Sequence, residues 1–372
     1  MTLPHIGDRG ERARTLAADP TGADLARHII DFDPDDPAHQ LFAVQDRVSR
    51  QPLTPIPWPA GLAPSVVPLT PAPDPDAGLP HADVLVVTWT VAEAKALADV
   101  LTPGLPTSSW TAYRHNFDTV FKPQIRQGAP ALTLGRLGLY AMTEIGGRRV
   151  LCLKSDLHLS QDGPKLPVRL LWKQIIEETA AELVITTGTA GAVGADVQLG
   201  DVALSKHVRF DCQKTFADQP FAQTRYTDRK HAGATSSQLR TAVDTLIPVN
   251  AAQLPPATRP PKIWTSTPDQ PADVLTTDFF AFDDTTDHWA LRATDPQARA
   301  VEMGDAVLGL VCAEDLTDPP AWVIVRNASD PQMDGSLPLK QQAAQAAGIY
   351  EKYGYWTTIV SAITVWALIA GL

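Results

Sequence analysis

The sequence predicts an α/β protein, a three-layer αβα sandwich around a mixed, largely parallel central sheet. Two observations predict this fold class. From about residue 82 onward, apolar runs of strand length alternate with runs of helix length, and this alternation is typical of a parallel sheet with helices on both faces. The chain has 372 residues, of which 44% are hydrophobic, so a large buried core is expected.

The expected elements follow one another in a regular order. Apolar runs bounded by turn residues indicate strands, and longer runs with apolar residues every three or four positions indicate helices. In chain order, we expect helices at 22–32 and 37–48, a strand at 82–90, a helix at 91–101, a strand at 148–155, a helix at 166–180, strands at 182–188 and from Gly200, a helix at 236–247, a strand at 321–329 and a helix from Leu339 onward.

The chain divides into an N-terminal extension, a linker and one main domain. Residues 1–50 form the helical extension. Residues 51–80 are rich in proline, which lacks a backbone donor and favours extended chain, so we expect a linker there. The main domain spans residues 81–372 and contains a polar insertion at about 213–273.

Charge and cysteine content narrow the possible partners. The chain carries 42 acidic and 31 basic residues, a net charge of -11, which argues against a nucleic-acid binder and favours small molecules as partners.

The three cysteines, Cys152, Cys212 and Cys312, lie far apart, without the spacing of a metal site or a disulfide framework. The charged N-terminus lacks the apolar core of a secretory signal, so we expect a cytoplasmic protein.

The C-terminal segment, residues 355–372, carries no charged side chain. It is about the minimum length for a membrane span, but Thr357, Thr358, Ser361 and Thr364 dilute it and no basic cluster flanks it. We therefore expect a buried or subunit-interface helix here, and a membrane anchor is the less favoured alternative.

Polar residues gather where the predicted strands end. Glu93 follows the first strand, glycines at 188, 191 and 194 follow the strand at 182–188, and Asp330 follows the strand at 321–329. In an open α/β sheet, ligands bind beyond the carboxyl ends of the strands. Two carboxylates that face a glycine-rich loop suit acid and base catalysis on a polar ligand.

Four stretches carry a resemblance to a known family. They are residues 82–97, residues 183–204 with Gly-Thr-Ala-Gly and Leu-Gly-Asp-Val, residues 298–312 with Val-Glu-Met, and residues 321–330 ending in Ser-Asp. In this order they resemble the nucleoside phosphorylase and nucleosidase superfamily, which includes purine nucleoside phosphorylase, uridine phosphorylase and methylthioadenosine/S-adenosylhomocysteine nucleosidase. The resemblance runs from about residue 82 to the C-terminus and leaves out the first 80 residues and the insertion.

The resemblance implies roles for the glycine-rich stretch and the acid. The backbone at Gly188 and Gly191 would pack against the ribose and the base, and Thr189 would face the anomeric side of the sugar. Asp330 matches the general acid that acts on the departing purine, and Ser329 stands beside it. An acid at the base suits this chemistry, because breaking an N-glycosidic bond leaves negative charge on the base.

Glu93 matches the residue that activates water in the hydrolytic branch of the family. Glu302 and Met303 match the ribose-binding stretch, but the chain departs from the family after Met303. Where relatives have a glutamate for the ribose hydroxyls, this chain has Gly304 and then Asp305, so either Asp305 binds the sugar from another angle or sugar recognition has changed.

Aromatic and polar residues elsewhere complete the expected site. The resemblance makes Phe280 the residue that stacks on the base, with Phe279 and Phe282 as neighbours. In the polar stretch at 154–167, Asp156 and His158 are candidates for contact with a 5′ substituent.

The resemblance implies an enzyme that cleaves a purine nucleoside or related nucleotide. Hydrolysis is favoured over phosphorolysis, because neither strand loop contains the arginine that a phosphate needs. The resemblance implies no metal or organic cofactor, a homodimer or larger oligomer and a pocket completed by a neighbouring subunit, for which His115 is a candidate.

Two alternatives remain open. The first is a phosphorylase that takes inorganic phosphate as co-substrate, with Arg114, Arg136 or Arg209 reaching the sugar from elsewhere. The second is a nucleotide-sensing or regulatory protein with little or no turnover, which the change after Met303 favours.

Overall fold

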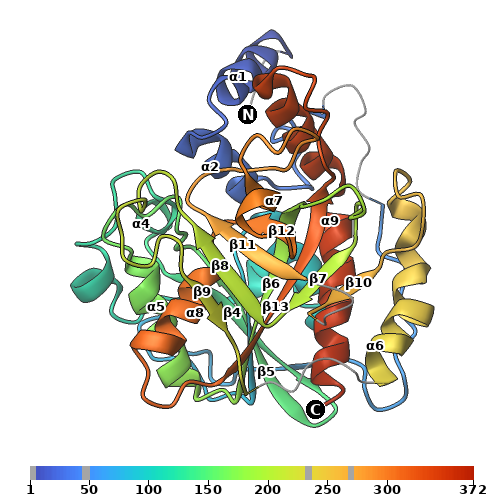
Figure 1. The fold of residues 1–372 in the computed structure, drawn as a ribbon. Helices are drawn as coiled ribbons and strands as arrows, with labels where there is room; N and C mark the ends of the chain where they lie inside the picture. The colour runs from blue at the N-terminus through green and yellow to red at the C-terminus, as the bar shows by residue number, and fades with distance from the viewer. Residues whose placement is uncertain (1–5, 44–50, 231–236, 267–271) are drawn as a thin grey trace.

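A computed structural model describes residues 6–43, 51–230, 237–266 and 272–372 (Figure 1). The described residues build a 13-stranded mixed sheet. In chain order, the strands are β1 (Ser65–Val67), β2 (Val84–Thr88), β3 (Thr111–Tyr113), β4 (Gly138–Ile145), β5 (Arg148–Ser155), β6 (Leu183–Ala192), β7 (Val202–Ser205), β8 (His207–Asp211), β9 (Arg225–Thr227), β10 (Ile263–Thr265), β11 (Asp273–Thr277), β12 (Ala298–Glu302) and β13 (Ala321–Asp330).

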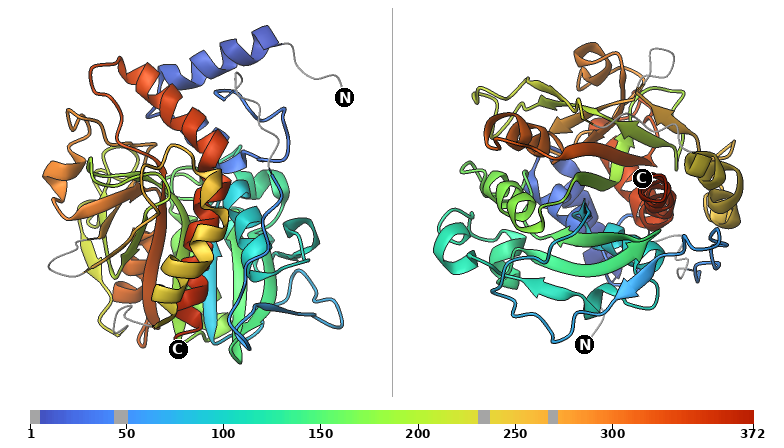
Figure 2. Two further views of the ribbon diagram at one scale, coloured as in Figure 1. Left: turned by 90° about the vertical axis from the view of Figure 1, so that its right-hand side faces the viewer. Right: turned by 90° about the horizontal axis from the view of Figure 1, so that it is seen from below.

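The helices lie on both sides of this sheet (Figure 2). In chain order, they are α1 (Ile6–Ala18), α2 (Ala23–Asp31), α3 (Val91–Leu101), α4 (Pro130–Leu134), α5 (Pro167–Thr179), α6 (Ser237–Thr241), α7 (Leu291–Thr294), α8 (Ala306–Glu314) and α9 (Leu339–Ile369). On one side α5 packs against α8, and on the other α3 packs against α9.

The sheet has a parallel centre. Its main path runs β1-β4-β5-β2-β6-β12-β11-β8-β9, with β13 paired to β6 and β7, β10 to β7, and β3 to β4. Strands β5, β2, β6 and β13 run parallel to one another, whereas β4 joins β5 and β12 joins β6 in antiparallel pairs. The predicted three-layer fold with a mixed, largely parallel sheet is confirmed.

Strand β2 shows why the sequence of a buried central strand is an unbroken run of apolar residues. Leu85 and Val87 join the apolar cluster under α5 and α8, whereas Val84 and Val86 join the cluster under α3 and α9. Successive side chains of a strand point to opposite faces, so both faces of this strand must be apolar.

The apolar C-terminal segment is part of the 31-residue helix α9. From Tyr355 to Ile369 its side chains are buried, and the apolar ones belong to the cluster that also contains residues of α3 and of the central strands. Two of the polar residues in this apolar segment bind Asn327 of β13. The Ser361 hydroxyl donates to the side-chain oxygen of Asn327 at 2.7 Å, and the Asn327 amide donates to the Thr357 hydroxyl at 2.7 Å. The expected buried helix is confirmed, and none of the described helices is long and apolar enough to span a bilayer.

The N-terminal segment packs onto the main domain. The helix expected at 22–32 forms as α2, and α1 precedes it. The helix expected at 37–48 is absent from residues 37–43, which form turns, and residues 44–50 lie outside the described part. The turns are stabilised by the carboxylate of Glu351 on α9, which accepts the backbone N–H groups of Leu41, Phe42 and Ala43. A buried charged acceptor thus takes the place of helical hydrogen bonds.

Two further segments differ in detail from the expectation. The proline-rich stretch contains β1, which pairs antiparallel with β4, and its Trp58 packs on Trp366 of α9. Within the expected insertion, helical turns run from 237 to 253, longer than the predicted helix at 236–247, and residues 231–236 and 267–271 lie outside the described part.

The glycine-rich stretch is not the loop that the sequence predicted. Strand β6 continues through it to Ala192, because β13 pairs with it as far as Gly191 and β12 pairs with Gly191 and Ala192 from the other side. Pairing with two long neighbours satisfies backbone groups that the glycines would otherwise expose.

Candidate active site

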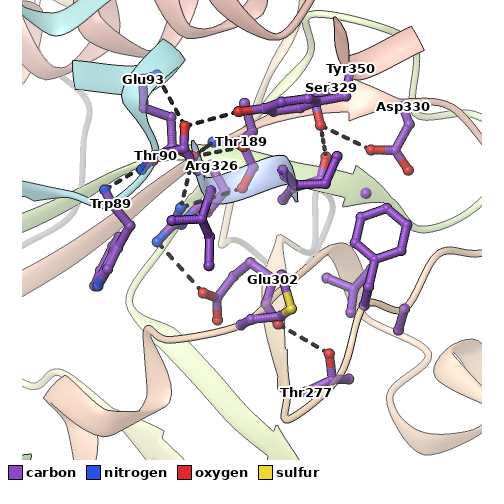
Figure 3. Close-up of a pocket in the computed structure, with 18 of the residues that line it drawn as sticks. Trp89, Thr90, Glu93, Thr189, Thr277, Glu302, Arg326, Ser329, Asp330 and Tyr350 are labelled. Atoms are coloured by element: carbon purple, nitrogen blue, oxygen red, sulfur yellow. Dashed lines mark hydrogen bonds and ion pairs between the residues drawn. The ribbon is translucent and has the colours of Figure 1, made fainter. Parts of the chain in front are cut away.

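A cavity lies where β2, β6, β12 and β13 end (Figure 3). Its walls come from these strand ends, from α2, α3 and α9, and from the segments after β5 and β11. The lining residues are Ile29, Ile30, Trp89, Thr90, Glu93, His158, Thr189, Ala190, Gly191, Thr277, Phe280, Ala281, Val301, Glu302, Met303, Arg326, Ser329, Asp330 and Tyr350.

Glu93 lies in the first turn of α3 and is 1% exposed. Its Oε2 accepts hydrogen bonds from the Thr88 hydroxyl at 2.8 Å and from the backbone N–H groups of Trp89 at 3.0 Å and Thr90 at 2.9 Å. Its Oε1 accepts from the backbone N–H and the hydroxyl of Thr189, both at 2.7 Å. One carboxylate therefore caps α3 and also holds the cavity wall of β6.

These contacts keep Glu93 ionised. Burial alone would raise its pKa, but the nearby guanidinium of Arg326 and the hydrogen bonds from Thr189 and Thr90 outweigh burial, so the pKa lies below its ordinary value. Glu93 is thus a fixed negative charge beside the Thr189 hydroxyl.

Gly188 leaves the space that this carboxylate occupies. A Cβ at this position would stand 2.4 Å from the carboxyl carbon of Glu93, and the glycine has φ +147°. A side chain here would have to displace Glu93. Gly188 supports the site from behind the cavity wall, whereas Gly191 lines the cavity itself.

Asp330 ends β13 on the opposite side of the cavity from the α3 cap (Figure 3). The register places its backbone against Gly191 of β6, where a Cβ would lie 3.1 Å from the carboxylate. The Ser329 hydroxyl donates to Oδ1 of Asp330 at 2.9 Å. Burial raises the pKa of Asp330 to about 7, against the opposing effect of that hydrogen bond. Asp330 can therefore carry a proton near neutral pH.

Arg326, four residues earlier on β13, is a buried cation that the sequence analysis missed. Its guanidinium binds Asp305 through two hydrogen bonds, from Nε at 2.7 Å and from Nη2 at 2.6 Å. Oε2 of Glu302 lies 3.6 Å from Nη2, and Oε1 of Glu93 lies 3.9 Å from Nη1. The sequence signal was a basic residue directly after the apolar run of the buried strand β13, because a buried charge is too costly without partners.

Asp305 is fully buried behind the cavity and is not among its lining residues. Because its carboxylate is held by Arg326, it is not placed to reach a sugar from another angle. Glu302 does line the cavity. Burial raises its pKa to about 8, and the negative charge of Asp305 adds to the rise while Arg326 opposes it.

Gly304 leaves open the space that a side chain after Met303 would fill. A Cβ there would lie 3.6 Å from two ring atoms of Trp89, whose indole stacks on Arg326 at 4.8 Å. The family glutamate therefore has no counterpart in this wall.

The apolar wall combines Phe280 and Met303, both next to Tyr350 and Ile29 in one cluster. Phe280, the candidate for stacking on the base, lines the cavity, whereas Phe279 and Phe282 do not. Phe279 instead packs against Trp289 at 5.1 Å.

Of the two residues proposed after β5, only His158 lines the cavity. Its Nδ1 accepts the backbone N–H of Ser160 at 3.2 Å, which places the ring proton on Nε2. Burial lowers its pKa to about 3, so the ring is neutral. Asp156 is bound instead by Arg136 and Lys154.

The three arginines that were candidates for binding a phosphate co-substrate lie away from the cavity. Arg114 pairs with Asp76 and Asp118, Arg209 donates to a backbone carbonyl, and none of the three arginines lines the cavity. His115 pairs with Glu178 at 2.6 Å outside the cavity. Within the described residues, no group of three or more His, Cys, Asp or Glu side chains is placed to hold a metal ion.

Replacing Arg326 should lower the free energy of unfolding more than replacing an arginine near the surface. Arg326→Met would leave Asp305 and Glu302 buried without their cation, and the expected loss in the free energy of unfolding is about 3–5 kcal/mol. Arg169→Met is the matched control, because Arg169 forms a similar two-bond pair with Asp315 near the surface, worth about 1 kcal/mol or less. Equal losses by urea denaturation would contradict this account of the buried cluster.

Comparison with known proteins places the chain in a family. The model of the phosphorylase superfamily matches residues 122–315, more than half of the chain. The chain belongs to the phosphorylase superfamily. This membership agrees with the resemblance drawn from the motifs and with the fold of the sheet. A search of curated proteins found no significant match.

Several solved structures are similar to this superfamily member. The 5′-methylthioadenosine/S-adenosylhomocysteine nucleosidase of Neisseria meningitidis is 18% identical, with 78% of this chain and 100% of that chain covered and a TM-score of 0.46. S-adenosylhomocysteine nucleosidase of Streptococcus pyogenes is 14% identical, with 80% and 99% covered and a TM-score of 0.47. A futalosine hydrolase mutant of Helicobacter pylori is 13% identical, with 77% and 98% covered and a TM-score of 0.44.

Proposed function

We propose that this phosphorylase-superfamily protein hydrolyses the N-glycosidic bond of a purine nucleoside or a related nucleotide. The observation that carries the proposal is the difference between two buried carboxyl groups on one cavity. Asp330 has its pKa raised to about 7, whereas the pKa of Glu93 is lowered. Two carboxyl groups whose pKa values are pushed apart are the usual sign of an acid and a base.

The acid acts on the base. Negative charge develops on the purine as the bond breaks, and protonated Asp330 donates to it, with the Ser329 hydroxyl holding the carboxyl group in position. Phe280, on the apolar wall, provides a face on which the purine stacks.

The ionised carboxylate acts at the sugar. Glu93 and the Thr189 hydroxyl stabilise the positive charge that develops at the anomeric carbon, and Glu93 takes the proton from the attacking water. Glu93 accepts hydrogen bonds from Thr88, Trp89, Thr90 and Thr189, and these bonds make it a weak base in the ground state. Water that attacks a sugar cation is acidic enough for such a base.

The charge of the cavity supports hydrolysis over phosphorolysis. Arg326 is the one Lys or Arg among the described lining residues, and Asp305, Glu302 and Glu93 surround it. A phosphate dianion would be desolvated next to carboxylates with no uncompensated cation, which is unfavourable by several kcal/mol.

The test is release of free base from a panel of purine nucleosides and nucleotides, with and without inorganic phosphate. We expect the same rate in both conditions and free sugar as the second product. A rate that depends on phosphate, with a sugar phosphate as product, would favour the phosphorylase. Binding without release from any substrate would favour the sensing protein.

We further propose a cytoplasmic homo-oligomer. Cys152, Cys212 and Cys312 are buried and free, which suits a reducing compartment. Sedimentation velocity of the full chain tests the oligomeric state, and a monomer at all concentrations would contradict it.

A further inference from the structure

The cavity is too small for a purine nucleoside in the form that the structure shows. Its volume is about 60 Å³, about twice the ~30 Å³ that one water molecule occupies in the liquid. Sites for small ligands usually measure ~300–1,000 Å³. A nucleoside can therefore enter only when part of the wall moves outward.

The strand ends and two of the loops are fixed parts of this wall. Strand β6 pairs with β2, β12 and β13, so these ends cannot separate without breaking the sheet. The segment after β11 is tied to the end of β6, because Asp283 accepts the backbone N–H of Gly194 at 2.9 Å. In the turn after β5, Asp162 accepts the backbone N–H of His158 at 2.6 Å. The main domain therefore holds these parts in place.

Helix α2 is a part of the wall that packs outside the sheet (Figure 1). Its Ile29 and Ile30 line the cavity and are buried. Helices α3 and α9 both contribute to the apolar cluster on the sheet, whereas the apolar residues of α2 pack in a separate, smaller cluster. Arg27 of α2 donates to the carbonyl of Gly128 at 2.8 Å in an exposed bond, which water can replace. Movement of α2 would leave the sheet intact.

One buried carboxylate holds α2 against α9. The side chain of Glu351 is fully buried. Its Oε1 lies 2.8 Å from Nε2 of His28 on α2 and accepts the backbone N–H of Leu41 at 3.0 Å. Its Oε2 accepts the backbone N–H groups of Phe42 at 2.9 Å and Ala43 at 2.8 Å. Glu351 thus fastens both α2 and the strap at residues 41–43 that follows it.

These bonds lie next to the site without being part of it. Glu351 does not line the cavity, but its neighbour Tyr350 does, and the Tyr350 hydroxyl donates to Thr90 at 2.9 Å. The strap crosses α9 at Gly348, where a Cβ would stand 3.4 Å from Cβ of Phe42. When α2 and the strap move away, water reaches the carboxylate, so the open form does not bury an unpaired charge.

We propose that α2 is a lid over the cavity and that Glu351 is the positioning residue that holds the lid closed. Substrate enters when the bonds of Glu351 open, and their re-formation encloses it. The inference goes beyond the proposed hydrolysis, because a lid serves a binding protein as well as an enzyme. It gives the N-terminal extension, which lies outside the family match at residues 122–315, a part in binding.

Hydrogen exchange of the full-length chain, followed by mass spectrometry, tests the role of Glu351. In Glu351→Gln the amide nitrogen faces N–H donors, which destabilises the closed form. We expect the backbone amides of α2 to exchange about tenfold faster than in the parent, and those of α8, on the other side of the sheet, to stay within about twofold. His28→Leu, which removes one of the four donors, should raise exchange in α2 about threefold.

Glu178→Gln is the matched control for this experiment. Glu178 lies on α5 and also accepts several hydrogen bonds, from the Leu79 backbone at 2.7 Å and the Tyr113 hydroxyl at 2.8 Å. It should leave exchange in α2 within about twofold. If Glu351→Gln leaves exchange in α2 unchanged, or raises it equally in α2 and α8, Glu351 does not hold a lid.

Adenosine tests the lid itself on the Asp330→Asn chain, which keeps the cavity but should not cleave the ligand. Saturating adenosine should slow exchange in α2 about tenfold and leave α8 unchanged. Calorimetric binding without this protection would overturn the lid. If adenosine does not bind, exchange in Glu351→Gln without ligand decides the inference.

Steady-state kinetics separate the lid from support of the catalytic groups. Glu351→Gln should raise KM for adenosine about tenfold and leave kcat within about threefold, because the variant changes the closed fraction and not the carboxyl groups of Glu93 and Asp330. A fall in kcat alone would make Glu351 a support of Glu93 and overturn the lid. Failure of base release, together with the expected exchange results, would overturn the proposed hydrolysis and support the lid.

Discussion

Asp330→Asn lowers kcat for purine release by about 10³-fold, one of the two largest effects on activity that we expect from a single substitution. Asparagine keeps the size of the side chain and its hydrogen bond with Ser329 but has no acidic proton for the departing base. General acid catalysis contributes about 10²- to 10⁴-fold to such reactions. Steady-state release of free base, followed by chromatography, measures the loss.

A nitrophenyl riboside provides the control for this substitution, because nitrophenolate leaves without being protonated. We expect Asp330→Asn to slow its cleavage less than tenfold. A similar loss on both substrates would mean that the substitution damages the site as a whole, and Asp330 would not be the acid.

Glu93→Gln lowers kcat by about 10²- to 10⁴-fold and also weakens the fold. Both oxygens of Glu93 accept N–H groups, so the amide nitrogen of glutamine would face a donor either at Thr189 or at the start of α3. The negative charge beside the sugar would also be lost. Both the rate of base release and the free energy of unfolding in urea should therefore fall.

Glu178→Gln is the matched control for Glu93→Gln. Glu178 also accepts several hydrogen bonds, from the Leu79 backbone at 2.7 Å and from the Tyr113 hydroxyl at 2.8 Å, but it does not line the cavity. We expect it to lower stability and leave kcat within twofold. Equal losses of kcat in the two variants would show that stability alone explains the effect at Glu93.

Much of the fold could be predicted because the central elements satisfy their own local rules. The helix predicted at 91–101 has those bounds in α3, where a Thr90–Glu93 capping box starts it. The strand predicted at 148–155 has those bounds in β5, whose apolar residues are buried on both faces. The glycine-rich stretch was misassigned because its strand conformation depends on pairing with β13 and β12, which are distant in sequence.

The candidate site could also be predicted only as far as local motifs define it. Motifs at strand ends brought Glu93, Thr189 and Asp330 to one cavity, as a parallel sheet requires. Asp305 remained a candidate for binding the sugar, because no local pattern reveals that Arg326, 21 positions away, holds its carboxylate. The position of Ile30 in the cavity wall was missed for a similar reason, because it follows from the packing of α2 onto α3 and α9, which no local pattern encodes.

The pH dependence of kcat/KM for a purine nucleoside tests the acid role of Asp330 most directly. Its pKa of about 7 predicts that the protonated, active form dominates below pH 7, so kcat/KM should fall about tenfold per pH unit above that value. Glu302, with a pKa raised to about 8, also titrates nearby, but its titration would affect every substrate. The alkaline fall near pH 7 should therefore be absent for the nitrophenyl riboside. The same fall on both substrates, or a flat profile from about pH 6 to 9 for the purine nucleoside, would contradict the account.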